Sequence, residues 1–297
     1  MKAAYLSPSE DLVDELCKEV GRVEAVHDRL VISHNVVDSH WAQNIWHNPE
    51  RISIGSVSDA AKKLKAIQRN WALYSTNNHR RAQLIQEQLP HVSAKPLSFL
   101  SPVPSAALGS WTLLDEKTVL ASPYCSSAFP NGEVKFKEDK TNPPSRAYLK
   151  LWEAFTVYGA YPKKGERVLE VGACPGGWTW VLNNLEADIT AVDRSPLAPA
   201  LMKQSNIKFQ KGDAFSILPK THGNFDWIFS DLACYPDKLY TWVKEWLDSG
   251  QVKNLICTLK FQGKTNYGAI SSFKKIPGSK LVHLYENKHE LTWMKTE

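Results

Sequence analysis

The chain has 297 residues, of which 43% are hydrophobic and 23% are charged, and its formal net charge is +5. These values are ordinary for a folded globular protein and leave room for one large domain or two smaller ones. The mild excess of positive charge permits a polyanionic partner without demanding one. The five cysteines are odd in number, widely spaced and never arranged as Cys-x-x-Cys, which argues against a disulfide framework and against a bound metal. Because no apolar run suits a signal peptide or a bilayer span, we expect a cytoplasmic protein with reduced thiols.

Residues 1–94 predict a small α/β domain with the element order β-α-β-β-α-β. The run Ser7-Pro8-Ser9-Glu10 has the form of a capping box with a proline start, so a helix is expected from there to Gly21. Ser56 begins a second capped helix of the same kind. The other expected elements are strands at 2–6, 22–26, 30–33 and 71–74 and a helix at 79–89. This order is that of a ferredoxin-like unit, which RNA-binding modules often use. The strands lack the aromatic signature of an RNA-binding sheet, so a purely structural domain is an equal alternative.

Residues 95–140 are rich in strand and turn residues and are expected to form a β-rich linker or subdomain. A polar, proline-bearing stretch at 138–144 marks the main boundary. From 141 to 297 the pattern changes to alternating helices and strands, which is typical of a mostly parallel sheet covered on both faces. We therefore expect a Rossmann-like α/β domain, whose last two strands form an antiparallel hairpin at the sheet edge.

A glycine-rich loop, Gly172-Ala-Cys-Pro-Gly-Gly177, directly follows the first strand of this domain. Ligands of open α/β sheets bind at the carboxyl ends of the strands, and glycines let a ligand approach the backbone closely. The helix that starts beyond the loop offers free N–H groups. The loop is neither G-x-G-x-x-G nor a Walker loop, which disfavours a nucleoside triphosphate.

Charged residues stand at the ends of the next four strands. Asp193 lies about 20 residues beyond the glycine loop, at the distance that suits hydrogen bonding to ribose hydroxyls. The others are Asp213, Asp231 and Lys260. A single loop aspartate is usually a turn former. Their recurrence at successive strand ends favours a shared ligand site.

Several of these motifs together resemble a known family, the FtsJ/RrmJ-like ribose 2′-O-methyltransferases. They are Ser145-Arg-Ala-Tyr-Leu-Lys150, the loop from Gly172 to Trp178, Ser230-Asp231, Leu259-Lys260 and the tail from Leu284 to Trp293. The likeness covers residues 145–297 and is strongest to the RlmM branch, which methylates a cytidine ribose in 23S ribosomal RNA. The resemblance implies a class I methyltransferase domain with S-adenosyl-L-methionine as its cofactor.

The resemblance also implies roles for individual residues. The family uses a Lys-Asp-Lys-Glu catalytic tetrad, which corresponds by motif position to Lys150, Asp231, Lys260 and Glu290, with Glu286 as the competitor for the last place. The implied cofactor-binding residues are Ser145, Gly172, Cys174, Pro175, Gly176, Gly177, Trp178, Asp193, Asp213 and Asp231. In this hypothesis Lys260 takes the proton of a ribose 2′-hydroxyl while the oxygen attacks the sulfonium methyl group.

The sequence leaves two other functions open. A base-nitrogen methyltransferase often carries an Asn/Asp-Pro-Pro-Tyr/Phe motif after its fourth strand, and the run Ser230-Asp-Leu-Ala-Cys-Tyr-Pro236 lacks the double proline. A non-catalytic RNA-binding protein on the same fold is a second alternative, which retention of all four tetrad residues disfavours. The expected partner is a structured RNA, 23S ribosomal RNA or its precursor, with transfer RNA or messenger RNA as alternatives. The protein is expected to be a monomer or a weak dimer.

Overall fold

The computed structural model describes all 297 residues, which divide into two compact units, Met1–Phe136 and Lys137–Glu297. Each unit has its own sheets and its own hydrophobic core, and each is described by itself. None of the helices combines the length and the apolar character needed to cross a membrane.

The N-terminal unit contains a five-stranded antiparallel sheet in the order β2-β3-β1-β4-β9. Helix α1 (Val13–Val20) follows a short 3₁₀ turn, η1 (Glu10–Leu12), and packs against β3. The five strands are β1 (Ala3–Leu6), β2 (Val23–His27), β3 (Leu30–Ser33), β4 (Asn44–His47) and β9 (Tyr124–Cys125).

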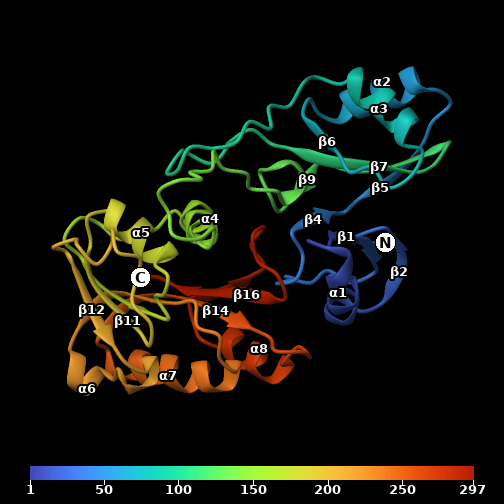
Figure 1. Cartoon of the computed structure of the whole chain (residues 1–297). Coiled ribbons are helices and arrows are strands. Elements are labelled where there is room, and N and C mark those ends of the chain that lie inside the picture. Colours follow the sequence, from blue (N-terminus) through green and yellow to red (C-terminus); the bar gives the residue numbers. More distant parts are fainter. The chain divides into compact units, whose positions relative to one another are not determined.

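A second sheet in this unit has four strands in the order β5-β8-β7-β6. Helices α2 (Val57–Ile67) and α3 (His79–Glu87) lie over one of its faces (Figure 1). Trp71 and Trp111 are fully buried in the core between them. The strands are β5 (Glu50–Ser53), β6 (Trp71–Leu73), β7 (Gly109–Asp115) and β8 (Thr118–Ser122), so the expected β-rich segment 95–140 supplies β7 and β8 to this sheet.

The expected ferredoxin-like order is not formed, because its strands divide between the two sheets. That order would place β6 beside β1. Both edges of β1 are already taken, by β3 on one side and β4 on the other, and β6 instead pairs in parallel with β7. The sequence pattern predicts neither β4 nor β5, and β4 takes the edge that β6 would have filled. An α/β unit was correct, but the pairing of its strands was wrong.

The two expected helix caps also differ in outcome. Ser56 caps α2 as expected, since its side chain accepts a hydrogen bond from the Asp59 amide at 3.1 Å. The capping box at Ser7 is not formed. The Ser7 hydroxyl donates to the Ser9 carbonyl at 2.8 Å, and the first helical turn begins only at Glu10.

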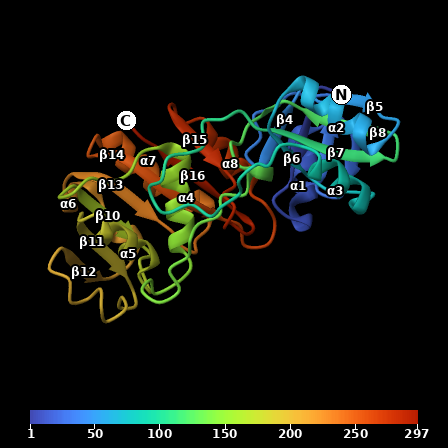
Figure 2. The ribbon, with the colours of Figure 1, turned by 90° about the horizontal axis from the view of Figure 1, so that it is seen from above.

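The C-terminal unit has a seven-stranded sheet in the order β12-β11-β10-β13-β14-β16-β15 (Figure 2). The first five strands are parallel, as expected for a Rossmann-like domain. The antiparallel strand is β16, which lies one place in from the edge, between β14 and β15. The strands are β10 (Arg167–Val171), β11 (Asp188–Asp193), β12 (Ile207–Lys211), β13 (Phe225–Ser230), β14 (Val252–Lys260), β15 (Ser279–Val282) and β16 (Glu290–Lys295).

Helices cover both faces of this sheet. Helices α4 (Tyr148–Tyr158) and α5 (Gly177–Asn184) lie on one face, and α6, α7 and α8 lie on the other (Figure 1). The latter are α6 (Pro219–His222), α7 (Pro236–Ser249) and α8 (Tyr267–Lys274). The sequence pattern does not predict α8, because a glycine and two serines interrupt its apolar residues. Its start is fixed by Asn266, whose side chain accepts from the Ala269 amide at 2.9 Å.

The strand order places a topological switch point between β10 and β13. The chain runs outward from β10 through β11 to β12, and later returns to β13 on the other side of β10. Loops that leave the carboxyl ends of β10 and β13 therefore diverge and leave a crevice between them. The glycine loop and Asp231 follow these two strands, so both lie at this crevice.

Candidate active site

A cleft of about 330 Å³ opens at the carboxyl ends of β10, β11 and β13. It contains eight of the ten predicted cofactor-binding residues: Ser145, Gly172, Cys174, Pro175, Gly177, Trp178, Asp193 and Asp231. A ninth, Asp213, lines an adjoining pocket that shares Gly172 and Asp193 with the cleft. The tenth, Gly176, is the N-cap residue of α5 and lines neither space. The structure therefore brings nearly all of the predicted set together.

The glycine loop leaves no room for side chains on its inner surface. Gly172 has a φ of +76°, and a Cβ atom there would lie 2.7 Å from the Leu232 side chain. A Cβ atom on Gly177 would lie 2.4 Å from the Ser145 hydroxyl oxygen. The positive φ of Gly172 favours glycine there, and a side chain at position 177 would displace the Ser145 hydroxyl.

Asp193 holds the glycine loop in place. One of its carboxylate oxygens accepts from the Cys174 amide at 3.0 Å, and the other accepts from the Ser195 amide at 2.9 Å. An ionised carboxylate has about four acceptor sites, so both oxygens can still accept a further hydrogen bond. Asp193 thus organises the loop and keeps acceptor capacity at the cleft.

Asp213 caps the short 3₁₀ turn η3 (Ala214–Ser216) at the adjoining pocket. The Phe215 amide donates to it at 3.0 Å, and Arg194 forms an ion pair with it at 3.1 Å. These two contacts, the Phe215 hydrogen bond first, hold the pKa of Asp213 below its ordinary value. A carboxylate therefore faces this pocket at neutral pH.

Trp178 joins the two helices beside the cleft. Its indole N–H donates to the Ala147 carbonyl at the start of α4, at 2.9 Å, and its ring packs edge-on against Phe229. Its side chain is almost fully buried. The residue therefore fixes the start of α4 relative to α5, in addition to lining the cleft.

The four predicted tetrad residues form one connected cluster. The Lys150 ammonium lies 2.9 Å from a Glu290 oxygen and 3.2 Å from an Asp231 oxygen. The Lys260 amine lies 3.0 Å from the same Asp231 oxygen, and it donates to the Asp231 main-chain carbonyl at 2.6 Å. Lys260 and Glu290 stand directly opposite each other in the β14–β16 ladder.

The two lysines differ in their surroundings. Burial lowers the pKa of Lys150, but the charges of Asp231 and Glu290 outweigh burial and raise it above the ordinary value. Lys150 is therefore a permanent cation at neutral pH. Lys260 lines the cofactor cleft, whereas Lys150 stands behind Asp231 and does not.

Glu286, the competitor for the last tetrad position, lies elsewhere. It forms an ion pair with Arg146 at 3.6 Å. Glu290 is the glutamate that contacts Lys150. The geometry therefore favours Glu290 as the fourth member of the cluster.

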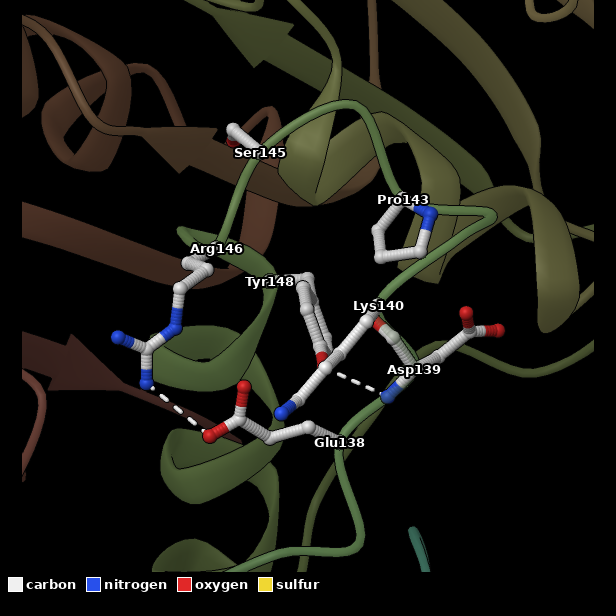
Figure 3. Close-up of a pocket in the computed structure, with 7 residues that line it drawn as sticks. All are labelled: Glu138, Asp139, Lys140, Pro143, Ser145, Arg146 and Tyr148. Carbon is white, nitrogen blue, oxygen red and sulfur yellow. Dashed lines mark hydrogen bonds and ion pairs between the residues drawn. The ribbon is translucent and has the colours of Figure 1, made fainter.

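A second pocket lies at the start of α4 (Figure 3). Arg146 reaches across it to Glu138 at 3.1 Å, and the Tyr148 hydroxyl accepts from the Asp139 amide at 2.9 Å. Ser145 lines both this pocket and the cofactor cleft. The two spaces are therefore neighbours, and the cations Lys140 and Arg146 stand beside the cleft.

Sequence reasoning missed one carboxyl group in the cleft. Glu170, on β10, is almost fully buried, lines the cleft and accepts from the Thr179 hydroxyl at 2.7 Å. Burial raises its pKa to about 8. The available signal was a glutamate inside the apolar run Val168-Leu-Glu-Val171, since parallel strands buried on both faces seldom carry a charge.

The cleft fits S-adenosylmethionine by its chemistry. The carboxyl groups of Asp193 and Asp231, together with the mainly neutral carboxyl of Glu170, face a space that has no cationic lining residue except Lys260. Such a lining suits a ligand that carries a positive sulfonium and hydroxyl groups, and the tight glycine loop lets that ligand lie against the backbone. The sheet order and this cleft together define a Rossmann-like methyltransferase domain.

Comparison with known proteins identifies the family. Residues 143–282 match the model of the FtsJ-like methyltransferase family. The chain is 30% identical over 168 residues to a ribosomal RNA large subunit methyltransferase M from Thauera aminoaromatica, a match covering 51% of this chain and 46% of that protein. It is 35% identical over 135 residues to a protein of the same name from Halorhodospira halophila, covering 44% and 39%. A crystal structure of Aeropyrum pernix fibrillarin with bound S-adenosyl-L-methionine is similar at 16% identity and a TM-score of 0.36, covering 62% of this chain and 81% of that one.

Residues 143–282, within the C-terminal unit, therefore match an FtsJ-like methyltransferase domain, and the cofactor of this family is S-adenosylmethionine. The chain spans about half the length of the curated relatives it matches.

Proposed function

We propose that this protein transfers the methyl group of S-adenosylmethionine to a ribose 2′-hydroxyl of RNA, and that its substrate is 23S ribosomal RNA or its precursor. The observation that supports this proposal most is the cluster of Lys150, Asp231, Lys260 and Glu290 at one end of the cofactor cleft. The relatives named above are ribosomal RNA large subunit methyltransferases, which supports the choice of substrate.

In this proposal the glycine loop, Asp193, Asp213 and Asp231 hold the cofactor. The backbone of the loop lies against it, and Asp193 accepts from its ribose hydroxyls while also tying down the Cys174 amide. When bound, the cofactor supplies an electrophilic methyl group. The buried carboxyl of Glu170 adds polarity to the same wall of the cleft.

Lys260 is the proposed general base. A ribose hydroxyl is a weak nucleophile until a base takes its proton. An uncharged lysine amine has two N–H bonds and one lone pair, and Asp231 offers two acceptors, its main-chain carbonyl and one carboxylate oxygen. With both N–H bonds used in this way, the lone pair is left for the substrate hydroxyl at the cleft.

Lys150 is the proposed fixed cation of the cluster. It has three donors, and oxygens of Asp231 and Glu290 accept from them at 2.9 to 3.4 Å. The raised pKa of Lys150 keeps it charged while Lys260 gains and loses a proton. Asp231 is thereby held between the permanently charged Lys150 and the amine of the proposed base, Lys260.

The loops around the cluster offer contacts for an RNA backbone. Arg146, Lys264 and Lys288 are exposed residues on three different loops. These loops are joined by the Arg146–Glu286 ion pair and by a hydrogen bond between Thr265 and His289 at 2.8 Å. Lysine and arginine contacts to phosphates supply most of the affinity for nucleic acid. The same proposal gives Met1–Phe136 the role of an auxiliary domain on the RNA side and the protein a cytoplasmic location.

The test replaces the proposed base. We expect Lys260→Ala to lower the rate of methyl transfer to unmodified ribosomal RNA at least about 100-fold, the usual contribution of a general base. Cofactor affinity, measured by calorimetry, should stay within about two-fold, since the loop and Asp193 remain. Mapping the product should show the methyl group on a ribose and not on a base.

The matched control is Lys253→Ala, on the same strand at its opposite end, where the lysine pairs with Asp226 at 2.8 Å. This variant should keep the rate of the unchanged protein. Full activity of Lys260→Ala, or a methyl group found on a base nitrogen, would overturn the proposal.

A further inference from the structure

Helix α4 carries a second buried charged residue, Glu153, that the mechanism above does not use. It follows Lys150 by three residues on the same helix. Its side chain is buried with 3% exposure, yet it lines neither the cofactor cleft nor the adjoining pocket. A buried glutamate without a cation beside it calls for a reason, because burying an ionisable group is costly.

The contact that Glu153 makes is to the segment 283–289, which connects β15 to β16. One carboxyl oxygen accepts from the Tyr285 amide at 2.8 Å, and the other has no hydrogen-bond partner. Burial raises the pKa of Glu153 to about 8, so the group is mainly uncharged at neutral pH. The side chain therefore acts as a neutral acceptor for the backbone of this segment at Tyr285 and Glu286.

The same segment is fastened separately to the sheet. The Phe261 amide donates to the His289 carbonyl at 3.3 Å, and the Asn287 side chain donates to the Thr292 hydroxyl at 3.0 Å. These contacts fix the segment relative to β14 and β16. The Glu153 side chain reaches this segment from the buried face of α4, the helix that carries Lys150.

We propose that Glu153 is a positioning residue for methyl transfer, which, by holding the Tyr285 backbone against α4, sets the separation at which Lys150 meets Glu290. This inference rests on the proposed function of the cluster. Two contacts then hold α4 against neighbouring parts of the chain, the segment 283–289 and the start of β16. One is the Glu153–Tyr285 hydrogen bond, and the other is the Lys150–Glu290 ion pair.

The Glu153–Tyr285 contact is needed because the lysine side chain is flexible. This side chain can follow a displaced partner, so the ion pair alone does not fix the positions of α4 and the segment. If α4 shifts relative to the segment and β16, Lys150 can still follow Glu290 while it withdraws from Asp231, which in turn holds Lys260. Displacements of about 1 Å at groups that position a reaction can cost about 100-fold in rate.

The experiment compares three substitutions in the full chain. Glu153→Ala removes the acceptor, and we expect it to lower kcat for RNA methylation by about 10- to 100-fold. The KM for RNA and the calorimetric affinity for S-adenosylmethionine should change less than about two-fold, since neither site contains Glu153. Glu153→Gln keeps a neutral acceptor of the same shape and should restore kcat to within about three-fold of the unchanged protein.

The third substitution, Glu166→Ala, is the matched control. Glu166 also accepts from a backbone amide, that of Lys163 at 2.8 Å, but it precedes β10 at the opposite end of the sheet. This variant should keep kcat. A loss of kcat equal to that of Glu153→Ala would show that general destabilisation is the cause and would overturn the proposal, as would a Glu153→Gln protein as slow as Glu153→Ala.

Hydrogen exchange of the same proteins separates this inference from the proposed function, because it needs no substrate. Glu153→Ala should speed amide exchange in 284–289 by at least about ten-fold, whereas Glu153→Gln and Glu166→Ala should leave that segment protected. Unchanged exchange in Glu153→Ala would overturn the positioning role. Altered exchange in a protein that methylates no RNA would instead contradict the proposed function and leave the contact itself established.

Discussion

Asp231 is the residue on which the candidate site depends most. It contacts both lysines of the cluster, through its carboxylate on one side and through its carboxylate and main-chain carbonyl on the other. Asp231 therefore couples Lys150, which stays charged, to the Lys260 amine that lines the cleft.

Asp193 gives the clearest residue-level prediction for cofactor binding. We expect Asp193→Ala to weaken the affinity for S-adenosylmethionine by about 10- to 100-fold, since charged hydrogen bonds contribute about 1.5 to 3 kcal/mol each. Two losses combine, the acceptor at the cleft and the tie to the Cys174 amide. Calorimetric titration measures the change.

The matched variant is Asp193→Asn, whose amide oxygen can still accept from the Cys174 amide. Its affinity should fall between those of the unchanged protein and Asp193→Ala. Equal affinity of all three proteins would show that Asp193 has no part in cofactor binding.

At the residue scale, some of the site residues could be predicted from the sequence and others could not. Asp231 and Lys260 could be named from the sequence, because a strand end followed by a charged residue leaves a visible pattern, whereas Lys150 and Glu290 were named only through the resemblance to the FtsJ-like family. Glu153 could not, since a helix that carries a glutamate usually exposes it. Only the packing of α4 against the segment 283–289 reveals its burial.

At the scale of elements, strand register decides the geometry of the cluster. Glu290 opens β16 and faces Lys260 across the β14–β16 ladder. A slip of one residue would turn Glu290 to the other face of the sheet. The sequence predicts both strands. It does not predict which strand pairs with a given edge, as the edge of β1 shows. Local patterns identify strands, whereas competition between β4 and β6 for one edge is decided by the assembled fold.

Helix caps give a stability prediction at this scale. Ser56→Ala removes the acceptor for the Asp59 amide and should lower the free energy of unfolding by about 1 kcal/mol. Ser9→Ala is the matched control, since Ser9 precedes η1 without a side-chain capping bond and should change stability by less than about 0.5 kcal/mol. Denaturant unfolding of the full chain compares them, and equal effects would contradict the capping role of Ser56.

At the scale of the whole molecule, buried ionisable groups link stability to pH. Among the buried carboxyl groups of the C-terminal unit, burial raises the pKa of Glu153 and of Glu170 to about 8. The same unit also buries His283, and burial lowers the pKa of this imidazole to about 4. All three are therefore mainly neutral in the folded protein near pH 7. The local sequence does not show that these groups are neutral, because the burial of each depends on elements packed from elsewhere in the chain.

These groups predict that stability falls as pH rises from about 6.5 to 8. Folded carboxyls with a raised pKa hold protons that the unfolded chain has released, so their contribution is complete below the ordinary value and is lost as pH rises through about 8. Each carboxyl adds a slope of at most about 1.4 kcal/mol per pH unit. His283 acts in the opposite sense, but its contribution is lost only as pH falls below about 6.5 toward 4.

Denaturant unfolding across this pH range, without cofactor, measures the slope. The double variant Glu153→Gln, Glu170→Gln should flatten it, because neither amide titrates. Asp139→Asn is the control. Hydrogen bonds from Asn142 and Thr141 hold the pKa of Asp139 below its ordinary value, so its contribution is lost only in acid and the slope above pH 6.5 should persist. A slope that survives in the double variant would contradict the raised pKa of Glu153 and Glu170.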